Sequence, residues 1–182
     1  MERLIIFGVL SLPVIFISWR TLFNVKSHGF YRFFGWEGIL WLIASNFRSW
    51  FVDPFSLEQI ISWVLLLVGS YYVIAGVIQM KTKGKSTKDR NEKALYQFEK
   101  TTELIDSGIF KYIRHPLYSS LIFLTWGIFF KSPTVVSFVV SVLSSIFFVI
   151  TSILDEKECI AYFGDQYRDY MKRSKRFIPF II

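Results

Sequence analysis

The sequence has few of the side chains that bind transition metals or form disulfides. Its 182 residues include one cysteine, Cys159, and two histidines, His28 and His115, which lie far apart in the chain. A single cysteine excludes both an intramolecular disulfide and a cysteine-based zinc site. Because the two histidines are so distant in sequence, we predict that no metal is bound.

Charged side chains are also scarce. They make up 19% of the chain, against about 25% in soluble domains, whereas hydrophobic residues make up 53% and the mean hydropathy is +0.42. The apolar residues come in long blocks, which favours a membrane protein. The net charge of +7 could suggest a nucleic-acid partner, but the basic residues flank the apolar blocks, as the positive-inside rule predicts. We therefore expect membrane lipids rather than nucleic acid as partners.

Five apolar blocks follow one another along the chain. They cover Leu4–Phe23, Trp36–Trp50, Leu57–Met80, Leu117–Phe130 and Thr134–Leu154. A transmembrane helix needs about 20 apolar residues. Bulky residues rather than a cleavage pattern end the first block, which favours a retained helix over a signal peptide. The second block contains Glu37 and Arg48, so it is either a true span or a re-entrant or interfacial helix.

These blocks predict an all-α fold, a polytopic membrane helical bundle with about five transmembrane helices in one domain over residues 1–182. Residues 1–80 supply three N-terminal spans, and residues 81–182 form the part that binds a cofactor. The last two blocks form a helical hairpin, and residues 109–116 could extend the fourth helix backwards. Residues 24–35 are expected to be a polar loop that contains His28. Gly69 and Gly76 are expected to let neighbouring helices approach closely.

The basic residues lie mainly on one side of this topology. That side holds the polar segment 81–113, the charged tail 155–182 and the loop after the first span, whereas the opposite side holds Asp53 and Lys131. We therefore place the polar segment and the C-terminus in the cytoplasm and the N-terminus outside. If the second block does not span, the N-terminus moves inside. The run Lys81–Arg90 is expected to be a solvated loop near anionic headgroups, and the tail should lie on the membrane surface.

Two charged groups meet at the cytoplasmic face of the hairpin. One is Arg114-His115-Pro116-Leu117-Tyr118 at the start of the fourth block, where the proline suits the first turn of a helix. The other is the acidic run 155–158 at the end of the fifth block. They form either an interfacial salt-bridge network or a pocket with both signs of charge, open to the cytosol and to lipid. Such a pocket suits a zwitterionic or cationic cofactor and an amphiphilic substrate.

Three motifs now appear in order over roughly the last eighty residues. They are Leu104-Ile-Asp-Ser-Gly108, then Arg114-His-Pro-Leu-Tyr118, then Glu156 followed by Phe163-Gly164, Tyr167 and Ile178-Pro179. This ordered set resembles the isoprenylcysteine carboxyl methyltransferase family, which is similar to the phospholipid N-methyltransferases. The resemblance implies an integral-membrane methyltransferase that uses S-adenosylmethionine. Its acceptor would be a lipophilic small molecule or a lipid that offers a carboxylate, an amine or a thiol.

The resemblance also implies roles for individual residues. Glu156 and Arg114 would be catalytic, and Glu156 would pair with the ammonium group of the cofactor. The implied cofactor-binding residues are Thr102, Glu103, Leu104, Ile105, Phe110, His115, Pro116, Leu117, Tyr118 and Glu156. The chain has Phe110 where the family often has tyrosine. It has Ser152 where some members carry an arginine for a substrate carboxylate, which weakens the case for a prenylcysteine acceptor.

Two other functions compete with this interpretation. Sterol reductases are similar in their C-terminal part and use a nicotinamide cofactor, although they are usually longer and have more spans. A membrane protein that keeps the fold without catalysis is the other alternative. The i, i+3 pair Tyr167 and Tyr170 is expected to pack the tail helix onto the pocket.

Overall fold

The computed structural model describes residues 1–84, 95 and 99–181, and these residues form an all-helical protein. The α-helices are α1 (Glu2–Ser18), α2 (His28–Asn46), α3 (Leu57–Lys83), α4 (Pro116–Phe129), α5 (Val135–Phe163) and α6 (Asp165–Arg173). Two short 3₁₀ helices are η1 (Phe47–Ser49) and η3 (Gly108–Lys111). The predicted all-α class is therefore confirmed for the described part of the chain, whereas the number of spans and the cofactor pocket stay predictions. Most of the expected loop Lys81–Arg90 lies outside it.

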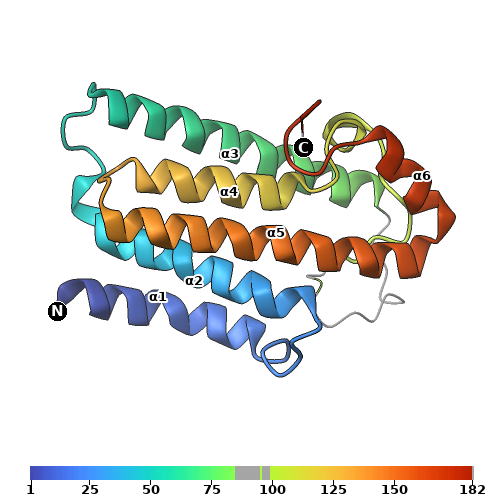
Figure 1. The fold of residues 1–182 in the computed structure, drawn as a ribbon, viewed down its shortest axis with the longest axis horizontal. Coiled ribbons are helices and arrows are strands. Elements are labelled where there is room, and N and C mark those ends of the chain that lie inside the picture. The colour runs from blue at the N-terminus through green and yellow to red at the C-terminus, as the bar shows by residue number, and fades with distance from the viewer. Residues whose placement is uncertain (85–94, 96–98, 182) are drawn as a thin grey trace.

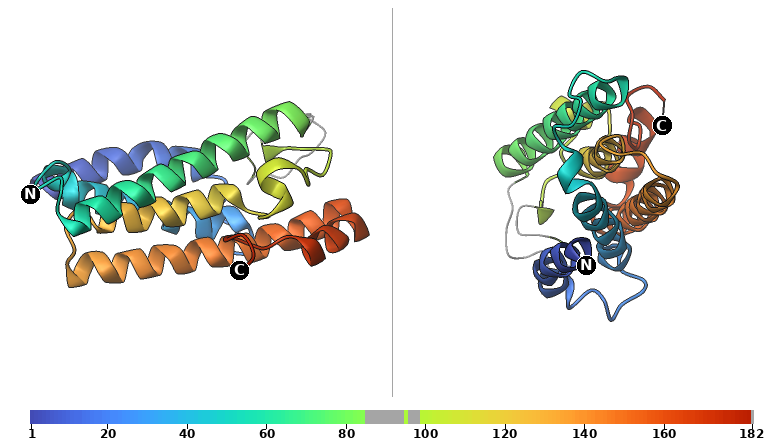
Figure 2. Two further views of the ribbon diagram at one scale, coloured as in Figure 1. Left: turned by 90° about the horizontal axis from the view of Figure 1, so that it is seen from above. Right: turned by 90° about the vertical axis from the view of Figure 1, so that its left-hand side faces the viewer.

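Helices α1 to α5 lie side by side along the long axis of the molecule, in the spatial order α3, α4, α5, α2, α1 (Figure 1). Consecutive helices run in opposite directions, and the end-on view shows them as one bundle (Figure 2). The ends of α1, α3 and α5 and the starts of α2 and α4 therefore gather at one end of the bundle. Helix α6 lies at that end too, and the N-terminus lies at the other (Figure 1).

Two helices, α3 and α5, are long and apolar enough to cross a membrane. Helix α1 has 17 residues and α4 has 14, which at 1.5 Å per residue give about 26 and about 21 Å, less than the about 30 Å of a hydrocarbon core. Large apolar side chains such as Phe16, Leu67 and Val136 are nevertheless exposed on α1, α3 and α5. So much exposed apolar surface is typical of a membrane protein.

Three expected helix boundaries were wrong. Helix α2 begins at His28 rather than at Trp36, so His28 is a buried helical residue and not part of a loop. Helix α5 continues to Phe163 rather than ending at Leu154. Residues 109–115 do not extend the fourth helix, which begins at Pro116 as its first-turn proline. In α2 and α5 the polar residues remain helical because partners on other elements satisfy them, as described below.

Small residues and hydroxyl groups hold the bundle together around a core of Ile39, Leu42, Leu66, Ile128 and Phe148. The Ser144 hydroxyl donates to the Gly35 carbonyl at 2.7 Å and thereby joins α5 to α2. The Ser62 hydroxyl donates to the Gly127 carbonyl at 2.7 Å and joins α3 to α4. Helices in membranes commonly associate through such contacts, because lipid provides no hydrophobic force between helices.

The predicted close approach at Gly69 and Gly76 is confirmed. A Cβ atom on Gly69 would lie 3.1 Å from the Ser120 carbonyl oxygen, and one on Gly76 would lie 3.2 Å from Pro116 Cγ. These two glycines let α3 pack closely along α4. Because Pro116 also borders the cavity described below, the α3–α4 contact positions one wall of that cavity.

We predict that Gly35→Ala lowers the free energy of unfolding by about 1–3 kcal/mol, the usual cost of overpacking a core. A Cβ atom at Gly35 would lie 2.5 Å from Cε1 of the fully buried Phe148 ring. Gly8→Ala is the matched control, because no atom lies within 4 Å of a Cβ at that position. Chemical unfolding in detergent measures both variants, and equal stabilities would contradict the proposed packing.

Candidate active site

The C-terminal tail fixes the conformation of the Arg114-His115-Pro116 turn. The backbone N–H of Arg114 donates to the Lys175 carbonyl at 2.7 Å, and that of His115 donates to the Arg176 carbonyl at 3.2 Å. The Lys175 N–H returns a bond to the Tyr112 carbonyl at 2.9 Å. The turn is thus held by a strand-like pairing with the tail, and α4 begins immediately after it.

Glu156 joins three elements through a buried network of charges. One of its carboxylate oxygens accepts from Arg114 Nε at 2.9 Å and from Arg176 Nε at 3.1 Å, and the other accepts from Arg176 Nη2 at 2.6 Å. Arg114 also donates to the carbonyl oxygens of Met171 and Ser174. Both oxygens of Glu156 are therefore engaged by arginines, and the predicted salt-bridge network is present at this face.

His115 lies between two carboxylates. Its Nε2 is 3.3 Å from Glu156 Oε1, and its Nδ1 is 3.5 Å from Asp155 Oδ2. Burial lowers the pKa of His115, but hydrogen bonds to Asp155 and Glu156 outweigh this effect, so the pKa is raised above its ordinary value. The imidazole therefore retains its proton more readily than an exposed histidine does, and it presents positive charge beside the cavity.

A cavity of about 80 Å³ opens beside this network. Its apolar and aromatic lining consists of Met80, Leu95, Leu104, Ile105, Phe110, Pro116, Leu117, Tyr118, Phe163, Tyr167 and Tyr170. Its polar lining consists of Glu99, Thr101, Arg114, His115, Asp155 and Cys159. The cavity thus combines carboxylates, cations and aromatic rings in one enclosed space.

Most of the predicted site residues lie on this wall. The structure brings together Leu104, Ile105, Phe110, Arg114, His115, Pro116, Leu117 and Tyr118. Three predicted residues, Thr102, Glu103 and Glu156, do not line the cavity. The backbone N–H groups of Thr102 and Glu103 donate to the Gly84 carbonyl at the end of α3, and Glu156 lies in the charge network. The roles assigned to all these residues stay predictions.

The lining residues that were not predicted as site residues include Asp155 and Cys159 of α5. They are spaced i, i+4 on α5, and Phe163 follows four residues later, so all three lie on one helical face. This periodicity could have indicated the wall. It was missed because α5 was expected to end at Leu154.

Two tyrosines of α6 complete the wall, as predicted. Tyr167 and Tyr170 are both buried, and the Tyr170 hydroxyl donates to the Phe110 carbonyl at 2.6 Å. Burial raises the pKa of both phenols well above their ordinary value. Both hydroxyls therefore stay protonated at neutral pH, and the Tyr170 hydroxyl donates its hydrogen to Phe110.

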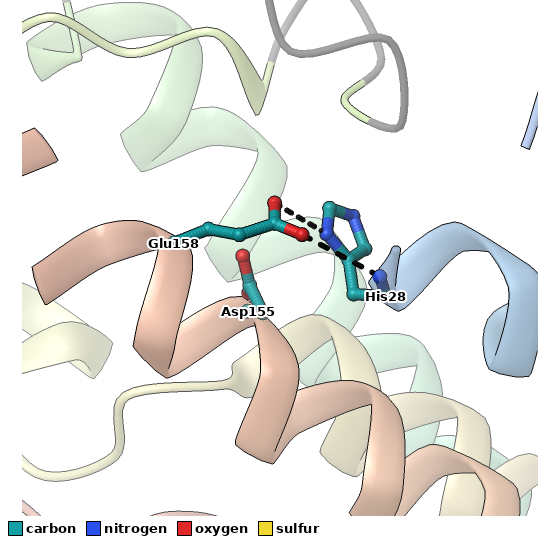
Figure 3. A group of neighbouring side chains, drawn as sticks. All are labelled: His28, Asp155 and Glu158. Carbon is teal, nitrogen blue, oxygen red and sulfur yellow. Dashed lines mark hydrogen bonds and ion pairs between the residues drawn. The ribbon is translucent and has the colours of Figure 1, made fainter. Parts of the chain in front are cut away.

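Helix α2 closes the remaining side of the site with two buried contacts. Arg32 Nη1 lies 3.1 Å from Oε2 of Glu99, which lines the cavity. One turn earlier, His28 Nδ1 lies 2.8 Å from Glu158 Oε2 on α5. Figure 3 shows that Asp155 points toward this pair, and ligand-type atoms of His28, Asp155 and Glu158 lie within 4.8 Å of one another. His28 and the acidic residues of α5 are thus neighbours in the fold, although they lie far apart in the sequence.

These features define an all-helical protein of membrane type with a charged, aromatic cavity at one end of its bundle. The phospholipid methyltransferase family model matches residues 57–166, which is more than half of the 182 residues. The chain therefore belongs to the phospholipid methyltransferase family, and the predicted family resemblance is confirmed. The match runs from α3 to the start of α6 and leaves α1 and α2 outside it.

Two curated relatives match part of the chain. Methanethiol S-methyltransferase of Pseudomonas deceptionensis is 31% identical over 71 residues, which cover 39% of this chain and 26% of the relative. Methanethiol S-methyltransferase of Crocosphaera subtropica (strain ATCC 51142 / BH68) is 31% identical over 76 residues, covering 41% of this chain and 28% of the relative. The matched part thus spans little more than a quarter of either relative. No solved structure is significantly similar to the chain.

We predict that Glu156→Gln lowers the free energy of unfolding by about 3 kcal/mol, because it leaves the buried Arg114 guanidinium without its anionic partner. Asp169→Asn is the control, since it breaks a pair with Lys172 in which both side chains are exposed. Chemical unfolding in detergent should show a large loss for the first variant and little change for the second. Similar values for both would contradict a supporting role for the Glu156 network.

The raised pKa of His115 predicts that stability depends on pH. A group whose pKa is higher in the folded state stabilises that state below its unfolded pKa, about 6.5 for histidine. This contribution should therefore be full below about pH 6.5 and be lost as the pH rises through the higher folded value. Unfolding curves from pH 6 to 9 for the wild type and for His115→Asn test this, and parallel pH profiles would contradict it.

Proposed function

We propose that the chain is a membrane methyltransferase that transfers the methyl group of S-adenosylmethionine to a small apolar thiol. One observation carries the proposal most directly: the cavity places carboxylates, cations and aromatic rings around one space in a chain of methyltransferase family. S-adenosylmethionine carries an ammonium, a carboxylate, a sulfonium and an adenine ring. The chemistry of the lining suits each of these groups.

The charged lining would hold the amino-acid end of this cofactor. Asp155 lines the cavity and can pair with the ammonium group, a role that suits it better than Glu156, whose oxygens already accept from two arginines. His115 and Arg114 would face the cofactor carboxylate. Because Arg114 is tied to Glu156 and to two carbonyl oxygens, its main contribution would be to hold the turn in position.

The aromatic lining would hold the adenine ring and the sulfonium group of the cofactor. The rings of Tyr118, Phe163 and Tyr167 offer flat apolar surfaces for adenine, and their faces attract a sulfonium cation. When bound, the cofactor supplies an activated methyl group. The protein would accelerate transfer mainly by aligning the acceptor with that group and by excluding water, without a covalent intermediate on the chain.

The relatives favour a thiol as acceptor. Both are named for S-methylation of methanethiol. The neutral Ser152 is fully buried and donates back to the Val149 carbonyl, so this position offers no cation for an acceptor carboxylate. A thiolate needs no such partner, since it is itself the nucleophile.

A phospholipid amine is the second candidate acceptor. The family description favours it, and so does an apolar groove of about 310 Å³ between α3, α4 and the tail. The groove is lined by Leu65, Ser119, Ile122, Phe123, Trp126, Phe130, Phe177 and Ile178. A groove of this kind on membrane helices could hold an acyl chain.

The bundle also supports the predicted topology of five spans. Consecutive helices alternate in direction, and the charged cavity lies at the end opposite the N-terminus (Figure 1). With the positive-inside rule, this arrangement is consistent with a cavity and C-terminus in the cytoplasm and an N-terminus outside. Family membership and the apolar helices α3 and α5 support the membrane location itself.

Isothermal titration of the purified chain in detergent tests the donor. We expect S-adenosylmethionine to bind, and Asp155→Asn to weaken binding by about 10- to 100-fold, the worth of one charge-assisted hydrogen bond. Asp169→Asn on the exposed face of α6 is the control and should bind normally. Binding of NADPH but not of S-adenosylmethionine would contradict the proposal and favour a reductase.

Transfer of a labelled methyl group tests the acceptor. The chain should methylate methanethiol more efficiently than phosphatidylethanolamine in vesicles. Label found only in phospholipid would replace the thiol with the second candidate.

A further inference from the structure

His28 has a buried ring nitrogen with no protein partner. The residue has 0% exposed surface, and within the described part of the chain its Nε2 atom has no hydrogen-bond partner. Buried polar atoms are nearly always hydrogen-bonded to protein or to an ordered water or ligand. A water or a ligand could therefore bind at this imidazole nitrogen, which has no partner among the described residues.

Glu158 determines which nitrogen is left over. Its Oε2 lies 2.8 Å from His28 Nδ1, and its Oε1 lies 3.5 Å from the His28 backbone nitrogen at the start of α2. Figure 3 shows both contacts, with the other ring nitrogen turned away from the carboxylate. When Nδ1 carries the hydrogen and donates to Glu158, Nε2 presents a lone pair. An imidazole oriented by a carboxylate in this way is the usual arrangement of a general base.

This pair lies directly beside the cavity. Asp155, whose carboxylate lies within 4.8 Å of the His28–Glu158 pair, lines the cavity, and so does Cys159, the neighbour of Glu158 in α5. One side chain therefore separates the pair from the cavity wall. The contact between His28 and Glu158 spans 130 residues of sequence, and His28 belongs to the part of the chain outside the family match.

We propose that His28 is the general base that accepts the proton of the thiol, an inference that rests on the proposed thiol acceptor. A simple alkyl thiol is a weaker acid than the cysteine side chain, whose pKa is about 8.5, so it is mostly protonated at neutral pH, whereas the thiolate is the reactive form. A base one side chain behind the cavity wall would supply that form by taking the proton through a bridging water. Glu158 would stabilise the imidazolium that results.

The step balances without another reactant. The S–H bond of the acceptor breaks, and its proton passes to His28 Nε2. The electron pair left on sulfur forms the new bond to the methyl carbon of S-adenosylmethionine, while the bond from that carbon to the sulfonium breaks and its pair stays on the departing sulfur. The imidazolium then releases the proton to water. A thiol and a sulfonium ion thus give two thioethers and one proton.

The pH dependence of methanethiol methylation by the full chain separates a base from a structural histidine. At pH 7 we expect His28→Gln to be about a hundredfold slower than wild type, within the range of general base catalysis. The difference should shrink toward pH 10, because the thiol then ionises in solution. Glu158→Gln should show a smaller defect with the same pH dependence.

Acceptors of different acidity give a second readout. Trifluoroethanethiol is more acidic than ethanethiol, so His28→Gln should lose less rate with it at pH 7. Ser144→Ala is the matched structural control, since it removes another hydrogen bond between α5 and α2 and leaves His28 in place. Its effect should be the same for both thiols and at every pH.

Three results would overturn the proposal. A loss in His28→Gln that is equal at all pH values and for both thiols would assign His28 a structural role. Activity that a chelator abolishes and zinc restores would assign His28, Asp155 and Glu158 to a metal ion instead. A wild type that binds S-adenosylmethionine but methylates no thiol would reject this base together with the thiol acceptor, while leaving the proposed donor intact.

Discussion

The carboxylate of Glu156 is the contact on which the active end of the bundle depends. It lies within α5, yet its partners come from the turn before α4 and from the C-terminal tail. A carboxylate this deeply buried is tolerable only when cations neutralise it, and the cations are equally costly to bury alone. The three elements must therefore assemble together. Their assembly places Arg114, His115 and Asp155 around one cavity.

The N-terminal helices contribute to the same site, although the family match begins only at residue 57. Helix α2 contacts the cavity wall through Arg32 and Glu99 and reaches α5 through His28 and Glu158. In a bundle whose consecutive helices alternate in direction, the start of α2 necessarily meets the end of α5.

Much of the cavity wall could be predicted from local sequence motifs. The Arg114–Tyr118 motif is contiguous and supplies five residues of the cavity wall, and Pro116 marks the start of α4. Leu104, Ile105 and Phe110 bring the predicted residues on this wall to eight. Helix ends were harder to predict. Asp155, Glu156 and Glu158 were expected in the charged tail after the fifth span, whereas they continue α5 because His115, two arginines and His28 satisfy them. Helix propensity and hydropathy describe only residues that are close in the sequence, so they do not show partners that are distant in it.

The sequence by itself determined the helical class, the membrane character and the family, because these follow from apolar blocks and from motifs that are local in the chain. Only the tertiary structure decided which carboxylate faces the cavity. Adjacent residues on a helix differ in direction by about 100°, so Asp155 points to the cavity while Glu156 points to the arginines. Only the fold, too, brought His28 to Glu158, since that contact depends on how α2 packs against α5.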